Sequence, residues 1–213
     1  MMKSVYGGVD HANVAVTLHE LGMVRKQKGD LEQAEVHLME ALRMMMSVCG
    51  SADNVEIAVT LHELGMARKQ KGDVKQAEEH LKEALRMKMS VYGSADNVNI
   101  AVTLHELGMV RKQKGDLEQA EVHLMEALRM MMSVYGGADN VEIAVTLHEL
   151  GMLLKEKGDL EQAEEHLKEA LRMKNSVHGG ADHWTVAGTL HKLGMWLSGE
   201  ETWSKSRSTG RRH

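Results

Sequence analysis

The sequence predicts an all-α solenoid of antiparallel helix pairs, and two observations lead to this fold class. The segment TLHELGM, or its near copy TLHKLGM, recurs with a period of 43 residues, beginning at Thr17, Thr60, Thr103, Thr146 and Thr189. Repeats with periods of about 20–50 residues are typical of solenoids and propellers. Proline and phenylalanine are absent and strong helix formers dominate, which favours helices over strands as the repeated element.

The second copy of the repeat shows how the helix pair is expected to form. Residues 54–71 make the first helix, and Asp53 is its expected N-cap because a glutamate three residues later completes a capping box. Gly72 supplies the left-handed residue that ends this helix, and Asp73 caps a second helix over residues 74–92. The turn is one or two residues long, so the two helices are expected to be antiparallel neighbours.

Both helices carry apolar residues at helical spacing, which indicates the faces that pack in the core. In the first helix these are Ile57, Ala58, Leu61, Leu64 and Gly65. In the second they are Val74, Ala77, Leu81, Ala84, Leu85, Met87 and Val91. One more position holds Met45 or Met131 in two units and lysine, Lys88 or Lys174, in the others. Such an exchange predicts an exposed side chain.

Composition and charge exclude several classes of protein. The 213-residue chain has a net charge of −5, which gives no general reason to expect nucleic acid or anionic membrane as a partner. No apolar run approaches the roughly 20 residues of a membrane span, and the N-terminus has no signal-peptide core. A single cysteine, Cys49, fits a reducing compartment. We therefore expect a cytoplasmic protein and leave its oligomeric state open.

The pattern Leu61-x2-Leu64-Gly65-x2-Arg68, followed by Ala77-x3-Leu81 and Ala84, resembles the tetratricopeptide signature. The unit is longer than the usual one of about 34 residues. Its second helix ends in SVYG and is followed by ADHxxVA, as in the repeats of kinesin light chain and nephrocystin-3-like proteins. The aromatic that is usual at Arg25, Arg68 and Arg111 is missing, from which we expect looser packing.

This resemblance implies a right-handed solenoid over residues 1–198, with four helix pairs and an extra terminal helix at about 183–197. Trp184 and Trp196 are unique to that last helix and are expected to help cover the end of the array. Residues 199–213 abandon the repeat and are expected to form a disordered Ser- and Arg-rich tail.

The letters HELGM differ by one residue from the zinc-protease motif H-E-x-x-H. Met23 stands where the second histidine ligand would be, and no copy of the repeat restores that histidine. His19 and Met23 form a pair that could suit Cu(I), but equivalent helices lie roughly 10 Å apart, which is too far to share an ion easily. We therefore expect no metal, no cofactor and no enzymatic activity, and interpret the pair as part of a surface.

In tetratricopeptide arrays the first helices line a concave groove that receives peptides or partner helices. The resemblance places thirteen residues on this surface, called the ladder below: His19, Met23, Lys26, Val59, His62, Met66, Lys69, His105, Met109, Lys112, His148, Met152 and Lys155. Methionine favours loose recognition of apolar side chains, whereas lysines and partly charged histidines favour acidic flanks. The expected function is a protein-interaction scaffold, in its specific version a cargo adaptor. The alternative is a structural array, or a gene fragment, with no dedicated ligand.

Overall fold

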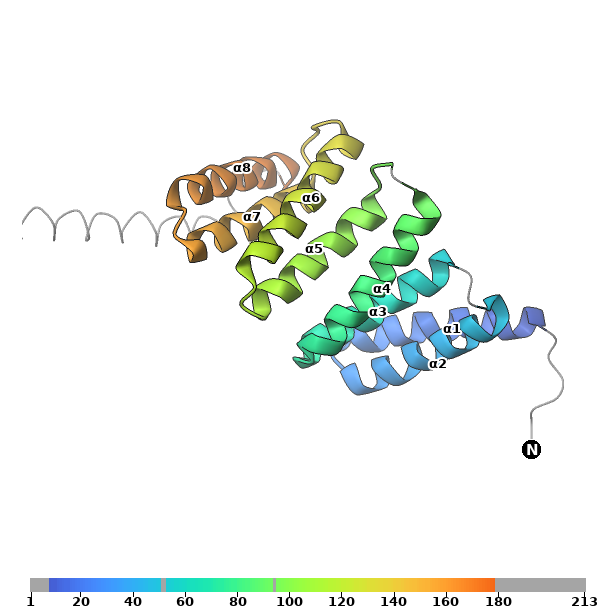
Figure 1. The fold of residues 1–213 in the computed structure, drawn as a ribbon. Helices are drawn as coiled ribbons and strands as arrows, with labels where there is room; N and C mark the ends of the chain where they lie inside the picture. Colours follow the sequence, from blue (N-terminus) through green and yellow to red (C-terminus); the bar gives the residue numbers. More distant parts are fainter. Residues whose placement is uncertain (1–7, 51–52, 94, 179–213) are drawn as a thin grey trace, which may run out of the picture. The chain divides into compact units, whose positions relative to one another are not determined.

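The computed structural model describes residues 8–50, 53–93 and 95–178, and these ranges contain helices and connecting turns but no strand (Figure 1). The helices are α1 (Gly8–Gln27), α2 (Leu31–Cys49), α3 (Val55–Lys71), α4 (Val74–Tyr92), α5 (Val98–Gln113), α6 (Leu117–Tyr135), α7 (Val141–Lys157) and α8 (Leu160–His178). The all-α prediction and the 43-residue period are therefore confirmed. The predicted terminal helix with Trp184 and Trp196, and the predicted tail 199–213, lie outside the described residues.

The chain divides into two compact units, Met1–Met130 and Met131–His213, and α6 crosses the boundary. In the first unit α1 packs on α2 and α3 on α4, while α1, α3 and α5 contact one another in chain order (Figure 1). The second helices α2 and α4 also contact the first helix of the following repeat. In the second unit α7 packs on α8. In the described part of the chain, every helix is too short or too polar to span a bilayer.

The N-cap of α3 is Asn54, so the prediction that Asp53 fills this role is wrong. Asn54 has an extended backbone, and its Oδ1 accepts hydrogen bonds from the backbone N–H groups of Glu56 and Ile57 at 2.7 and 3.2 Å. Asp53 instead accepts two hydrogen bonds from Arg86 of α4, at 2.7 and 3.1 Å. The carboxylate thus fixes the start of α3 to the second helix of the same repeat.

The turn between α3 and α4 forms as predicted. Gly72 has φ of 85°, in the left-handed region, and ends α3. The Asp73 side chain accepts a hydrogen bond of 3.3 Å from the backbone N–H of Gln76 and caps α4. Only two residues separate the helices, which forces them into the antiparallel pair shown by their contacts.

The glycine of HELGM is required by close helix packing. A Cβ added to Gly65 would lie 2.8 Å from Cγ of Leu81 and 3.2 Å from the carbonyl oxygen of Ala77. Gly22, Gly108 and Gly151 meet the second helices of their own repeats in the same way. Each repeat therefore needs this glycine to bring its two helices together.

The predicted core is largely confirmed. The five predicted residues of the first helix are buried as expected. In α4, Val74 and Leu85 are only half-buried, and Val91 near its end is 42% exposed. Leu21 is 40% exposed, although its equivalent Leu64 is 1% exposed. Leu64 packs against Leu38 of the preceding repeat, whereas no helix in the described ranges precedes α1. Burial at this position therefore depends on a preceding repeat.

The prediction that the Met45 and Lys88 position is exposed is wrong, because both side chains are buried, at 6% and 3% exposure. The position lies between its own repeat and the first helix of the next one. The Lys88 ammonium donates hydrogen bonds to Oγ1 of Thr103 at 2.8 Å and to the carbonyl oxygen of Asn99 at 3.2 Å. These acceptors allow a buried lysine where another repeat has methionine.

Candidate functional site

The ladder residues lie on α1, α3, α5 and α7, the first helices of the four repeats. Spacings of four and seven residues place His19, Met23 and Lys26 on one side of α1, and each later helix repeats this arrangement. Most ladder side chains are half-buried, whereas His62 and His148 are buried. The ladder is therefore a partly covered surface and not a row of free side chains.

Two of the ladder histidines, His19 and His62, join one repeat to the next. Nδ1 of His19 lies 3.0 Å from Oγ1 of Thr60, and Nδ1 of His62 lies 3.2 Å from Oγ1 of Thr103. Burial, and then the positive charge of Lys88, lower the pKa of His62 to about 3. The expectation of a partly charged histidine that attracts acidic flanks is therefore wrong for His62, which stays neutral at physiological pH.

Two ladder lysines, Lys26 and Lys69, are held by carboxylates of the next first helix. Lys26 forms an ion pair with Glu63, and Lys69 forms the same pair with Glu106. These lysine side chains are only 15% and 21% exposed. Their charges are matched within the fold, so they do not supply the free positive surface that the sequence predicted.

An open cavity of about 200 Å³ lies on the first-helix side of the first unit, between α1, α3 and the last turns of α2. We call it the first-gap pocket. It is lined by Val16, His19, Glu20, Met45, Val55, Glu56, Val59 and Thr60. Two of these lining residues, His19 and Val59, belong to the predicted ladder. The pocket thus combines three valines and a methionine with two glutamates.

In the described part of the chain, no three His, Cys, Asp or Glu side chains come together as a metal site would require. His19 and Met23 remain a single pair on α1, and the imidazole nitrogen Nδ1 is already engaged by Thr60. The chemistry that this surface offers is therefore apolar contact with charged groups at its edge.

The repeat pattern, the helix pairs and the close glycine contacts define the family. The sequence model of the family described as "Tetratricopeptide repeat" matches residues 13–90, 56–133 and 99–176. The chain belongs to the tetratricopeptide repeat family. No curated protein sequence matches it significantly.

Crystal structures of several other proteins share this fold. A putative kinesin light chain from Podosopora anserina with nearly identical TPR-like repeats is 18% identical, with a TM-score of 0.73 over 93% of this chain and 95% of that one. BtubC (BKLC) from P. vanneervenii is 22% identical, with a TM-score of 0.72 over 84% of this chain and 68% of that one. The apo form of RapI is 13% identical, with a TM-score of 0.66 over 78% of this chain and 44% of that one. The likeness to these structures shows a shared fold.

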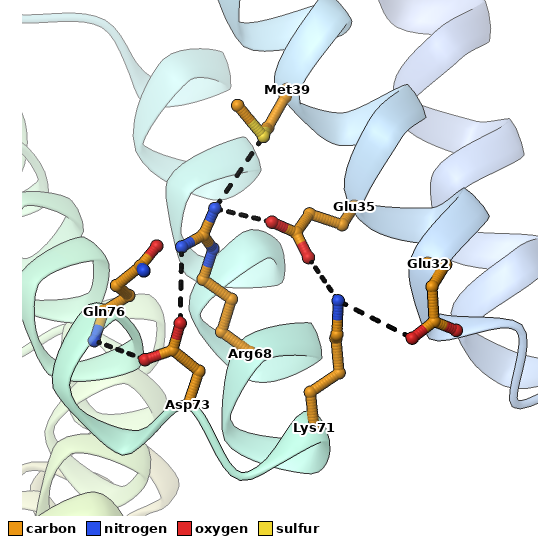
Figure 2. Close-up of polar contacts among 7 residues, drawn as sticks. All are labelled: Glu32, Glu35, Met39, Arg68, Lys71, Asp73 and Gln76. Carbon is orange, nitrogen blue, oxygen red and sulfur yellow. Dashed lines mark hydrogen bonds and ion pairs between the residues drawn. The ribbon is translucent and has the colours of Figure 1, made fainter.

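In this tetratricopeptide array an ion-pair network occupies the position at which the usual aromatic is missing. Figure 2 shows Arg68 of α3 reaching across to α2, where it donates to Glu35 at 2.6 Å, with Asp73 at 3.7 Å on its other side. Lys71 contacts the same Glu35 at 2.8 Å and Glu32 at 3.7 Å. Arg68 is buried by this network. The arginine therefore connects consecutive repeats at the place where looser packing was expected.

The same network recurs one repeat later around Glu78. Arg111 and Lys114 contact this carboxylate at 2.7 and 2.5 Å, and Lys82 contacts it at 2.6 Å. Burial opposes ionisation of Glu78, but hydrogen bonds from the two lysines and the charge of Arg111 outweigh it and lower the pKa to about 2. Glu78 is therefore ionised throughout the physiological range.

Sequence reasoning missed several residues of the first-gap pocket, among them Glu20, Met45 and Glu56. The signal for Met45 was present, since its position alternates between methionine and lysine along the array. That alternation was interpreted as exposure, but it marks a buried position between repeats. Glu20 and Glu56 gave no signal because their surroundings depend on how α1 and α3 lie against each other.

Proposed function

We propose that this protein is a non-catalytic scaffold that binds an extended or helical segment of a partner protein on the surface formed by its first helices. Arrays of this family use such extended surfaces for binding other proteins. The observation that carries the proposal is the first-gap pocket, an open and largely apolar cavity on this surface. Ligand pockets in proteins are typically concave and mostly apolar, with a few polar groups that set orientation.

In its specific version the proposal is cargo-adaptor work in the cytoplasm, supported by the kinesin light chain-like neighbours. We also propose the domain organisation expected from the repeats, a solenoid over residues 1–198 followed by a tail. Protein or peptide is the proposed class of partner, and neither nucleic acid nor membrane is included.

A structural array without a dedicated ligand is the second candidate, and one observation favours it. His19, Lys26 and Lys69 of the ladder are already engaged by side chains of the next repeat. If the remaining ladder residues bind nothing, these contacts alone explain why the HELGM segment is repeated.

A random peptide library displayed on phage tests the two candidates with the full chain as bait. Val16→Arg blocks the first-gap pocket, since Val16 lines it and is 43% exposed. Val36→Arg is the matched control, because Val36 is 58% exposed on α2 and lies outside the pocket. Peptides that bind the wild type and Val36→Arg but do not bind Val16→Arg support the scaffold. Absence of enriched peptides supports the structural array, and equal binding to both variants contradicts the first-gap pocket as the binding site.

A further inference from the structure

Resting on the proposed function, we infer that the first-gap pocket anchors one aliphatic or methionine side chain of a partner segment and that Glu20 and Glu56 bind a lysine or arginine next to it. The partner class is thus an apolar-and-basic peptide. This reverses the acidic flanks that the sequence alone suggested.

The size and lining of the pocket fit a single apolar side chain. Its apolar lining consists of Met45, which is buried, and of Val16, Val55 and Val59. An apolar cavity of about 150 Å³ in a protein can hold a benzene molecule. A pocket of about 200 Å³ therefore has room for one leucine- or methionine-sized group.

The next gap along the array differs at the position of Met45. One period later this position is Lys88, whose ammonium bonds to Thr103 and to the carbonyl oxygen of Asn99. A positive charge there disfavours both an apolar side chain and a basic neighbour. An apolar-and-basic segment therefore fits the first gap, at Met45, better than the next gap, at Lys88.

Two carboxylates at the first-gap pocket remain available for a partner. Glu20 and Glu56 are exposed, and neither forms an ion pair with any residue that the structure describes. Glu63, the equivalent of Glu20 in the next repeat, is instead held by Lys26.

The availability of Glu56 has a separate cause. Its equivalent two repeats later, Glu142, accepts a hydrogen bond of 2.7 Å from the hydroxyl of Tyr135. At the position of Tyr135 the first repeat has Cys49, which has no phenol to donate. The Cys49 sulfur instead accepts from the side-chain amide of Asn54 at 3.6 Å. Two independent differences between repeats therefore leave negative charge around an apolar cavity, and charge complementarity selects a basic flank.

Met45→Lys tests the inference, because Lys88 shows that this fold accommodates a lysine at the equivalent position. The probes are synthetic nine-residue peptides with a central leucine flanked by lysines, by glutamates or by serines, measured by fluorescence anisotropy. Of the three probes, we expect the lysine-flanked one to bind the wild type most tightly. The same probe should bind Met45→Lys about tenfold more weakly than the wild type. Lys88→Met, the matched control, is expected to keep the wild-type affinity at the first gap. Circular dichroism checks that each variant is folded.

The double variant Glu20→Gln/Glu56→Gln is expected to bind the lysine-flanked probe more weakly than the wild type does. Its affinity for the serine-flanked probe should be unchanged. Preference for the glutamate-flanked probe, or equal binding to the wild type and Met45→Lys, would overturn the inference. The proposed function would survive that result if library peptides bound the wild type but not Val16→Arg. Both the proposed function and the inference would fail if no peptide bound the wild type. A dimer of the wild type that Met45→Lys disrupts would identify a second copy as the occupant and overturn the inference as well.

Discussion

His62 and Thr103 are 41 residues apart in the chain, and a hydrogen bond of 3.2 Å joins Nδ1 of one to Oγ1 of the other. The pair of His19 and Thr60 repeats this relationship one repeat earlier, at 3.0 Å. Both partners come from copies of the TLHELGM segment, so the segment binds to its own next copy. The histidine of this segment therefore belongs to the contacts between repeats.

Lowering the pH is expected to reduce the stability of the folded chain because of His62. The pKa of this side chain is about 3 in the folded chain, against 6.5 for an ordinary imidazole, because burial and nearby lysines oppose protonation. Between these values the unfolded chain binds a proton that the folded chain does not, so stability is full above pH 6.5 and is lost as pH falls toward 3.

Urea denaturation at pH 7 and pH 5 checks this prediction. Between these pH values the wild type should lose about 2 kcal/mol more of its unfolding free energy than His62→Gln. The variant is less stable at pH 7 because it loses the contact with Thr103, but its dependence on pH should be flatter. Equal losses in the two proteins would show that His62 is protonated in the folded state.

Lys88 is expected to reduce stability at neutral pH. Burial lowers the pKa of its ammonium to about 8, although the charge of Glu63 acts in the opposite direction. Lys88→Met, which copies the side chain found at Met45, should raise the unfolding free energy by about 1–3 kcal/mol at pH 7. The gain should shrink as pH rises from 8 to 10.5, because the unfolded wild type binds more protons there and the wild type is stabilised. A gain that is constant over this range would contradict the explanation.

The local elements could be predicted from the sequence, but the contacts between repeats could not. The bounds of α4, the turn at Gly72 and the close contact of Gly65 each depend on residues within one repeat, where spacing and propensity are sufficient. Lys26 and Glu63 are 37 residues apart, and their pairing depends on how one helix pair lies against the next. The same holds for Lys88 and Thr103, whose burial arises only when repeats stack. The ladder residues therefore lie on the first helices, but the sequence did not show that Lys26 and Lys69 pair with the next repeat.

Arg68 and Arg25 occupy equivalent positions and provide a matched pair of substitutions. Arg68 is buried and bonded to Glu35 of the preceding repeat, whereas the Arg25 side chain is 43% exposed and contacts Asp30 at 3.1 Å. Arg68→Ala should lower the unfolding free energy by about 1–3 kcal/mol, since it leaves a carboxylate with one partner fewer. Arg25→Ala should change it by less than about 1 kcal/mol, as for exposed ion pairs. Similar effects of the two substitutions, measured by urea denaturation, would show that the network in Figure 2 adds no stability between repeats.

Gly65→Ala tests whether TLHELGM is primarily a packing segment. The added Cβ would lie 2.8 Å from Cγ of Leu81, and a buried leucine can move aside only by disturbing its neighbours. We expect a loss of about 1–3 kcal/mol of unfolding free energy, despite the higher helix propensity of alanine. Met66→Ala, one residue further on, is the matched control, because Met66 is half-buried on the ladder and should affect stability less. In the peptide assay a folded Gly65→Ala chain should bind the lysine-flanked probe as the wild type does, since Gly65 does not line the first-gap pocket. A Gly65→Ala chain as stable as the wild type would mean that α3 and α4 are not held at the distance that this glycine sets.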